Sequence, residues 1–248
     1  EAWIGGPGIG SRFGGIVQGW IDTETFYYQS EASGYSHLYL YNLNTEKSKQ
    51  LTNGNYEVQR AILSLDKKSF YIVSNQVHPG EQHWYKLDIS TGLASKITSM
   101  TGAHNVAMSP DEKIIAYLYS YSNKPWELYI QENKPDSKPM QITDKAMSAE
   151  FKSYAWRDPE IINFKAKDGA QVYGRLYKPA KKINNKAAVL FVHGAGYLQN
   201  AHKWWSNYFR EYMFHNLLTD LGYTVIDIDY RASAGYGRDW RTGIYRFM

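Results

Sequence analysis

An apolar segment of the sequence runs directly into a glycine-rich stretch whose residues could stabilise a negatively charged oxygen. Residues 187–193 read AAVLFVH, and the final residue, His193, is followed by Gly194, Ala195 and, after a second glycine, Tyr197. Small residues let backbone N–H groups approach a substrate oxygen closely, as acyl transfer requires when its tetrahedral intermediate develops charge. These residues therefore indicate an oxyanion-binding loop, and a plain strand-to-helix turn is the alternative.

An oxyanion loop serves a nucleophile, and no serine of the sequence lies in the setting that an elbow requires. A nucleophile elbow needs small residues two positions before and two after the serine, because the strand turns sharply into a helix there. Ser233 has Gly235 after it but Arg231 before it, and Ser11 has Ile9 before it and Phe13 after it. The loop would therefore serve a nucleophile that residues 1–248 do not contain.

Two other groups of polar residues could carry chemistry. Arg231 stands just after the apolar segment 223–229 and before Ser-Ala-Gly-Tyr-Gly, so it could line a substrate cleft or brace a turn. His78 and His83 lie five positions apart, but Glu81 is the only carboxylate near them, which favours an ordinary loop over a metal site. The sequence contains no cysteine, which excludes a disulfide framework and a thiolate zinc site. We predict neither a metal nor a cofactor.

The elements around the glycine-rich stretch have the pattern of an α/β sheet. The continuous apolar run at 187–193 is typical of a strand buried on both faces. A helix should follow, with Ser206 as N-cap, apolar residues at 209, 213, 217 and 221, and Gly222 at its end. A second buried strand is expected at 223–229, which completes a βαβ unit, and reactive groups gather at the carboxyl ends of such strands.

Upstream, residues 162–179 predict a hairpin that turns at Asp168-Gly169, a pair suited to a tight turn. Before it, up to about residue 150, short segments rich in tyrosine and β-branched residues predict antiparallel strands. These segments repeat, because Leu51-Thr52, Ile97-Thr98 and Ile142-Thr143 recur at gaps of 46 and 45 residues. A period near 45 with about four strands per unit indicates two to three β-propeller blades, with an open antiparallel sandwich as the alternative.

Composition limits the function classes. The 248 residues are 43% hydrophobic and 21% charged, which is ordinary for a globular protein. The net charge of +4 is spread along the chain with no run of five basic residues, so we do not expect a nucleic-acid partner. The longest apolar run, 187–192, is far shorter than the roughly 18 residues of a membrane span. The first ten residues do not read as a signal peptide.

The order of these segments resembles a known family. The repeated strands are followed by INFKAKDGAQVYGRLYKP, then VLFVHGAGY, then GYTVIDIDYRASAGYG, and the strand GYSHLYLY stands near the start. This order resembles the prolyl oligopeptidase family of serine peptidases, most closely its dipeptidyl peptidase IV branch, over essentially the whole chain. The fold class implied is mixed: the C-terminal part of a β-propeller in residues 1–155, then the N-terminal part of an α/β-hydrolase domain in residues 156–248, which lacks the catalytic triad.

The resemblance also implies an activity. It implies a serine peptidase that acts on short peptides, with release of X-Pro or X-Ala dipeptides. Its Ser, Asp and His would lie beyond Met248, with a Gly-x-Ser-x-Gly elbow within about 30 to 60 further residues. The partners implied are a peptide substrate and a second copy of the protein in a homodimer. The location implied is periplasmic or extracellular.

The sequence departs from the branch at two points. A tyrosine hydroxyl just after the equivalent strand helps to hold the oxyanion in that branch, but His193 takes the place here and Tyr197 comes four residues later. The backbone N–H of Gly194 or Ala195 is the better candidate donor. No adjacent Glu-Glu pair occurs in residues 1–248, so the branch's capture of a substrate amino terminus is not carried over. An esterase of the same fold, and a non-catalytic propeller module with a degenerate hydrolase domain, remain alternative functions.

Overall fold

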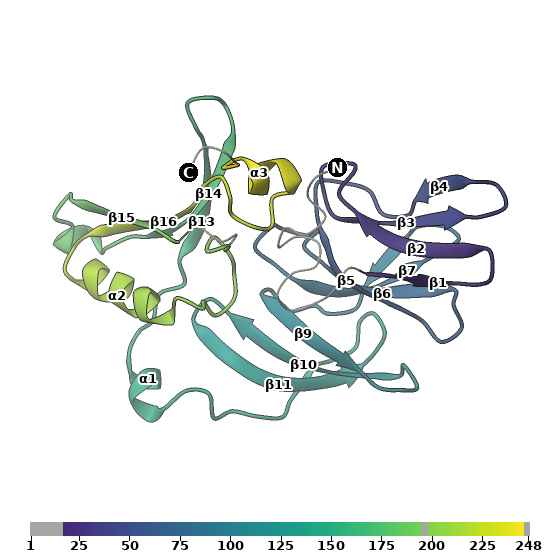
Figure 1. Ribbon diagram of the computed structural model, residues 1–248. Coiled ribbons are helices and arrows are strands. Elements are labelled where there is room, and N and C mark those ends of the chain that lie inside the picture. Colours follow the sequence, from purple (N-terminus) through teal and green to yellow (C-terminus); the bar gives the residue numbers. More distant parts are fainter. Residues whose placement is uncertain (1–16, 195–197, 246–248) are drawn as a thin grey trace.

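The computed structural model describes residues 17–194 and 198–245, whose strands form four sheets of four strands each (Figure 1). The first sheet contains β1 (Gln18–Trp20), β2 (Thr25–Ser30), β3 (His37–Asn42) and β4 (Lys47–Gln50). The second contains β5 (Val58–Leu63), β6 (Ser69–Ser74), β7 (His83–Asp88) and β8 (Ala94–Lys96). The third contains β9 (Ala103–Met108), β10 (Ile114–Tyr121), β11 (Lys124–Glu132) and β12 (Met140–Gln141). In all three, consecutive strands pair antiparallel, which confirms the predicted strand type.

The repeated threonines have a structural role that explains their spacing. Each follows the last strand of its sheet, and its hydroxyl accepts a hydrogen bond of 2.9–3.0 Å from a backbone N–H of the third strand: Leu38 to Thr52, Trp84 to Thr98 and Leu128 to Thr143. The preceding apolar residue donates its N–H to the carbonyl of the same third-strand residue. One threonine per sheet therefore holds the end of the fourth strand against the third strand. The sequence period equals the number of residues from one four-stranded sheet to the next.

The three sheets are joined through apolar cores on both faces of the second sheet. Successive side chains of a strand point to opposite faces. Phe70 and Ile72 of β6 accordingly pack in a cluster with Leu38 of the first sheet, whereas Tyr71 and Val73 pack in a cluster with residues of β9 and β10. All six residues of β6 are buried. The second sheet is thus the central layer of this part of the molecule.

The fourth sheet differs in its connections. It contains β13 (Glu160–Lys165), β14 (Gln171–Tyr177), β15 (Ala188–Val192) and β16 (Thr224–Asp229), in the order β13-β14-β16-β15. The strands β15 and β16 pair in parallel, and the other two pairs are antiparallel. The hairpin predicted at Asp168-Gly169 is confirmed, with a positive φ of 85° at Gly169.

Short helices complete the chain. The helix α1 (Ala149–Ser153) lies between the third and fourth sheets, and its N-cap Ser148 accepts a hydrogen bond from the N–H of Phe151. A 3₁₀ turn, η1 (Lys181–Ile183), precedes β15. The helix α2 (Phe209–Asp220) connects β15 to β16 and covers one face of the fourth sheet, and α3 (Arg238–Thr242) follows β16 (Figure 1).

The structure corrects two expectations about the βαβ unit. The helix begins two residues later than expected: its N-cap is Tyr208, and Ser206 lies outside it and accepts a hydrogen bond from the N–H of Tyr208. The expected apolar stripe is also not the buried face, because Leu217 and Leu221 are 51% and 61% exposed. The helix instead buries four mostly polar residues, Tyr212, His215, Asn216 and Thr219.

The strand β15 was expected to be buried on both faces, and this is wrong for the described residues. Leu190 and Val192 are 60% and 54% exposed. The reason is geometric: α2 covers the face that carries Val189 and Phe191, and β15 is the outer strand of the fourth sheet.

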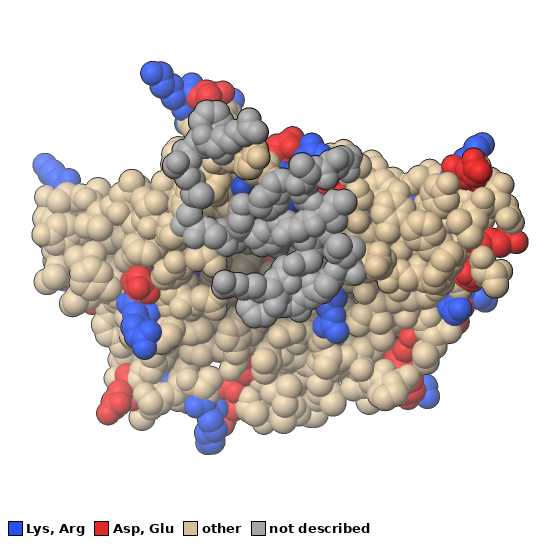
Figure 2. Space-filling model, in the orientation of Figure 1, with Lys and Arg blue, Asp and Glu red and all other residues tan. Residues whose placement is uncertain are grey.

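The charged side chains are mixed on the visible surface. Lysine and arginine alternate with aspartate and glutamate over the face shown in Figure 2, without a large area of one sign. No helix among residues 17–194 and 198–245 is long and apolar enough to cross a bilayer.

Buried histidines make the stability of the fold depend on pH. Burial lowers the pKa of His104 to about 3 and that of His215 to about 4. Because these values lie below the ordinary 6.5, the neutral imidazoles contribute stability that is complete above pH 6.5 and is lost as the pH falls toward 4 and 3. We expect each histidine to lower the free energy of unfolding by about 1.4 kcal/mol per pH unit in this interval.

Urea unfolding at pH 6.5, 5.5 and 4.5 would measure this slope. Burial raises the pKa of Asp227 to about 6, so the folded protein takes up a proton on this carboxyl below pH 6. This uptake offsets the contribution of one histidine to the pH dependence of the free energy of unfolding. In His104→Gln the free energy of unfolding should change with pH less steeply, by about 1.4 kcal/mol per pH unit, because one fewer group takes up a proton on unfolding. An unchanged slope in His104→Gln would contradict the assignment of this effect to His104.

Candidate active site

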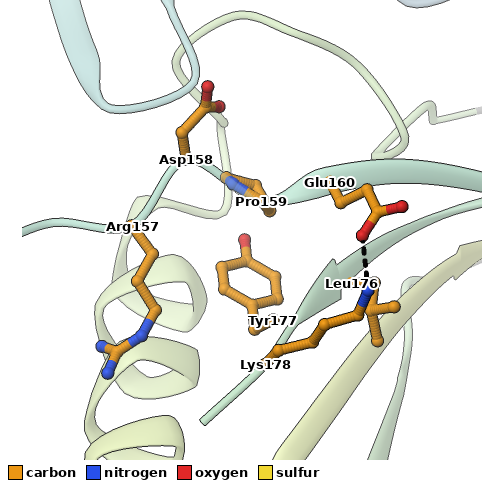
Figure 3. Close-up of a pocket in the computed structure, with 7 residues that line it drawn as sticks. All are labelled: Arg157, Asp158, Pro159, Glu160, Leu176, Tyr177 and Lys178. Atoms are coloured by element: carbon orange, nitrogen blue, oxygen red, sulfur yellow. Dashed lines mark hydrogen bonds and ion pairs between the residues drawn. The ribbon is translucent and has the colours of Figure 1, made fainter. Parts of the chain in front are cut away.

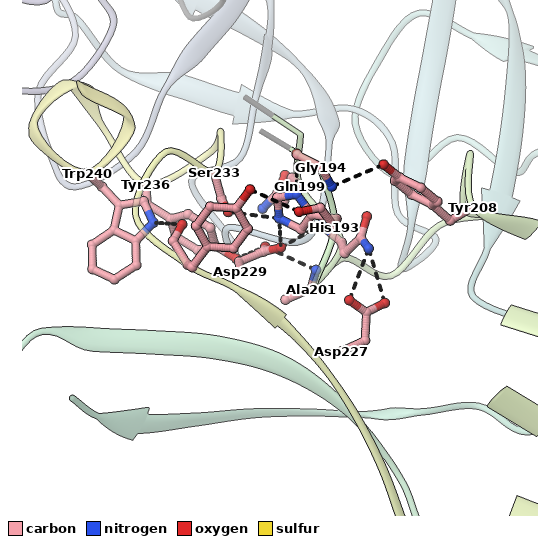
Figure 4. A network of polar contacts seen from close by, with 12 residues as sticks. His193, Gly194, Gln199, Ala201, Tyr208, Asp227, Asp229, Ser233, Tyr236 and Trp240 are labelled. Carbon is pink, nitrogen blue, oxygen red and sulfur yellow. Dashed lines mark hydrogen bonds and ion pairs between the residues drawn. The ribbon is translucent and has the colours of Figure 1, made fainter. Parts of the chain in front are cut away.

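The residues predicted to form the oxyanion loop lie where two parallel strands end. The last pair of the β15–β16 register joins Val192 to Ile228, so His193, which follows β15, and Asp229, the last residue of β16, lie at the same edge of the fourth sheet (Figure 4). Gly194 follows His193 and is exposed. Ala195 and Tyr197, the other two predicted loop residues, lie outside the described residues. The structure therefore places the first half of the predicted loop at the carboxyl ends of the parallel strands.

His193 is the buried centre of this edge. Its side chain is 1% exposed, and its ring stacks on Tyr230 with centroids 4.8 Å apart. The Nδ1 atom lies 3.0 Å from the carbonyl oxygen of Gly194, and Nε2 lies 3.0 Å from the Ser233 hydroxyl and 3.4 Å from Oδ1 of Asp229. A carbonyl on one nitrogen and a carboxylate on the other can both be satisfied when the imidazole carries two protons.

The electrostatics agree with this proton arrangement. Burial lowers the pKa of His193, but hydrogen bonding to the Asp229 carboxylate and to the Gly194 carbonyl outweighs it, so the pKa is raised above its ordinary value. A histidine held in this way orients the loop backbone. It is not poised to accept a proton from a nucleophile.

The group of Ser233, His193 and Asp229 contains the residue types of a catalytic triad without its geometry. In a triad, serine and aspartate contact opposite nitrogens of the histidine. Here both contact Nε2, and Ser233 is fully buried. A substrate carbonyl could not reach the Ser233 hydroxyl, so the three residues form a structural network.

Asp229 binds a later part of the connection from β15 to α2, at Asn200 and Ala201. Its carboxylate accepts hydrogen bonds from the N–H groups of Asn200 and Ala201 at 2.7 and 3.0 Å and from the Tyr236 hydroxyl at 2.6 Å. Asn200 also donates its side-chain amide to Asp227 at 3.0 Å. Sequence reasoning missed these two aspartates, although acidic residues within the apolar segment VIDID are a signal, since a buried carboxylate needs partners.

Of the predicted oxyanion donors, the N–H of Gly194 is the one that belongs to a described residue. It lies 3.5 Å from the hydroxyl of Tyr208, the N-cap of α2 (Figure 4). Among the described residues, a Cβ placed on Gly194 would meet this hydroxyl alone within 4 Å, at 3.7 Å. An oxygen that accepted a hydrogen bond from this N–H would take the place of the Tyr208 hydroxyl.

Residues 16–126 match the family model for the dipeptidyl peptidase IV N-terminal region. The chain is 28% identical to dipeptidyl peptidase 4 of Trichophyton equinum over 225 residues, which is 87% of its length. It is 29% identical to dipeptidyl peptidase 4 of Arthroderma otae over 229 residues. A probable dipeptidyl peptidase 4 of Aspergillus flavus is 29% identical over 239 residues, 91% of the chain. The resemblance to the dipeptidyl peptidase IV family is confirmed.

The match covers only part of these dipeptidyl peptidase IV relatives. The chain spans 28% of the length of the first two and 30% of the third. The family-model match ends within β11, so the fourth sheet and the His193 edge lie outside it.

Arg231, the predicted substrate-binding residue, contacts the hairpin of the fourth sheet. Its guanidinium forms an ion pair with Asp168 and lies 5.4 Å from the centre of the Trp240 ring. Backbone and Arg231 hydrogen bonds lower the pKa of Asp168 below its ordinary value. This placement favours the second of the two alternatives, a residue that braces a turn.

A pocket of about 230 Å³ occurs elsewhere on the fourth sheet and is lined by Arg157–Glu160 and Leu176–Lys178 (Figure 3). Tyr177 pairs with Val225 near the start of β16, so this pocket lies at the sheet edge opposite His193. Its charged groups are paired within the protein, Lys178 with Glu160 and Arg157 with Asp220. Among the residues that the structure describes, no group of three His, Asp or Glu side chains could hold a metal ion.

Proposed function

We propose that this chain is part of a serine-type dipeptidyl peptidase that releases X-Pro or X-Ala dipeptides from short peptides. Its first three sheets are blades of a β-propeller within residues 1–155, and the fourth sheet with α2 is the first part of an α/β-hydrolase domain within residues 156–248. The observation that carries the proposal is the His193–Gly194 backbone at the carboxyl ends of two parallel strands. The relatives named dipeptidyl peptidase 4 support the substrate class.

In the proposed reaction, the N–H of Gly194 donates a hydrogen bond to the substrate carbonyl oxygen as it becomes an oxyanion. Ala195 and Tyr197 are the other candidate donors of the loop. The nucleophilic serine, the aspartate and the histidine are proposed to lie outside residues 1–248. His193 and Asp229 act on the loop backbone, because their polar atoms contact the loop and its neighbours. A homodimer located in the periplasm or outside the cell, without a cofactor, completes the proposal.

The activity of the full-length protein tests this function. We expect it to hydrolyse Gly-Pro p-nitroanilide and to be labelled by a fluorophosphonate, which reacts with an activated serine. Blocking the amino group of the substrate should abolish turnover if dipeptides are released from a free amino terminus. Hydrolysis of p-nitrophenyl butyrate alone would identify an esterase instead. A protein that gives neither reaction nor labelling would be a non-catalytic binding module.

Residues 1–248 alone should not turn over Gly-Pro p-nitroanilide. Without a nucleophile and its base, only the weak rate enhancement from oxyanion binding is left. The measurement compares the purified 248-residue chain with the full-length protein at equal concentration. Activity of the short chain that survives removal of trace proteases would contradict the placement of the triad outside it.

A further inference from the structure

A buried ion pair connects the last helix to the first sheet. Arg241 of α3 is 1% exposed and Glu31, just after β2, is 6% exposed. Both oxygens of Glu31 accept hydrogen bonds from Arg241, from Nη1 at 2.5 Å and from Nη2 at 2.6 Å. Two parallel bonds of this kind fix the orientation of both groups as well as their distance.

The residues next to Arg241 are held by the first two sheets as well. The contacts are backbone or side-chain hydrogen bonds of 2.8–3.0 Å: Arg238 N–H to the Gly34 carbonyl, Arg238 Nη1 to the Glu31 carbonyl, Gly237 N–H to the Glu57 carboxylate, and Asn75 Nδ2 to the Gly235 carbonyl. The close approach requires glycine, because a Cβ on Gly237 would lie 2.7 Å from the Gly34 carbonyl oxygen. Residues 235–241 are therefore seated on the loops of the first and second sheets.

The other side of the same segment contacts the His193 edge. Trp240 donates its indole N–H to the Tyr230 carbonyl at 3.0 Å, and the Tyr230 hydroxyl donates to the His193 carbonyl at 2.9 Å. Tyr236 donates to Asp229, the carboxylate that holds Asn200 and Ala201 (Figure 4). A continuous series of contacts thus runs from Glu31 through Arg241 and its neighbour Trp240 to the backbone beside Gly194.

We propose that Glu31 and Arg241 are a positioning pair that sets the geometry of the His193–Gly194 backbone. This inference rests on the proposed peptidase function. If the pair shifts, Trp240 and Tyr236 shift with it, and the supports of both ends of the loop move. A displacement of about 1 Å at a reacting centre costs on the order of a hundredfold in rate, so catalysis reports such a shift sensitively.

Arg241→Lys tests the geometry separately from the charge. Lysine keeps the positive charge beside Glu31 but cannot form the two parallel bonds. Removing either charge outright would leave its partner buried and unpaired, which is strongly destabilising. Glu31→Asp, which keeps the charge and shortens the reach, is the second variant. Arg157→Lys is the matched control, because Arg157 forms a 2.6 Å ion pair with Asp220 of α2 at the opposite edge of the fourth sheet.

The measurements are kcat and KM of the full-length protein with Gly-Pro p-nitroanilide, well below the Tm of each variant. We expect kcat to fall about tenfold in Arg241→Lys and in Glu31→Asp, with KM within twofold of the wild type, and to be unchanged in Arg157→Lys. If Arg241→Lys lowers only the Tm and leaves kcat at the value of the control, the pair has a structural role alone and the proposal is wrong.

Hydrogen exchange gives a readout that does not depend on activity. Amides of peptides that contain His193, Gly194, Asn200 and Ala201 should exchange about tenfold faster in Arg241→Lys than in Arg157→Lys. Equal exchange in the two variants would overturn the positioning role. An inactive wild type whose loop still responds to Arg241→Lys would instead refute the peptidase function and retain the positioning of the loop.

Discussion

Gly194→Val is expected to lower kcat of the full-length protein about a hundredfold, the size of effect seen when one oxyanion donor is lost. The branched side chain would lie beside the Gly194 N–H, where the substrate oxygen is proposed to bind. The fold should be nearly unaffected, because Gly194 does not have a positive φ and, among the described residues, its Cβ would meet only the Tyr208 hydroxyl at 3.7 Å.

The comparison that supports this result uses Gly194→Ala and a thermal melt of each variant. A methyl group obstructs the N–H less than an isopropyl group, so kcat should decrease in the order wild type, alanine, valine while the Tm stays within a few degrees. An unchanged kcat in Gly194→Val would remove the catalytic interpretation of the loop. A fall in Tm that parallels the fall in kcat would instead assign the effect to folding.

Gly102→Ala should lower the free energy of unfolding strongly, with a loss of about 3 kcal/mol. Gly102 precedes β9 and has a φ of 132°, which side chains with a Cβ rarely adopt. A Cβ there would overlap the Ser120 carbonyl oxygen and lie 3.2 Å from the carbonyl oxygen of Lys203. Both neighbours are backbone atoms, so the strain cannot be relieved by a side-chain rotation.

Gly169→Ala separates the two causes of this loss. Gly169 also has a positive φ, 85°, but a Cβ there would meet no atom of a described residue within 4 Å. Its substitution should therefore cost only the conformational strain, about 1 kcal/mol. Urea unfolding of both variants gives the two free energies. Equal losses would show that the close approach of Gly102 to Ser120 and Lys203 does not matter for stability.

The strands were predictable because their signals are local. Alternation of apolar residues and the threonines at 52, 98 and 143 follow directly from the pleat and from the closure of each sheet edge. The buried face of α2 was not predictable in this way. Asn216 is buried because its side chain accepts a hydrogen bond from the N–H of Arg157, 59 residues away, and no pattern within the helix carries that information.

The same distinction applies to the candidate site. The position of His193 and Gly194 follows from a strand that ends in a glycine-rich stretch, which is a local signal. The side-chain partners of His193 Nε2 are Asp229, the last residue of β16, and Ser233, which follows that strand, and their approach depends on the parallel pairing of β15 with β16. The sequence shows the aspartates within an apolar strand, but only the assembled sheet shows which backbone amides they hold.

The ion pair between Glu31 and Arg241 also constrains how the protein is made. The two residues are 210 positions apart in the chain. At a synthesis rate of about 5–20 residues per second, the ribosome adds the intervening residues in roughly 10–40 s. During this time the loop after β2 has an anionic group without its eventual cation, while the sheets behind it can already form. The first sheet therefore acquires its final contacts only after α3 has emerged from the ribosome, although its strands are translated before those of the other three sheets.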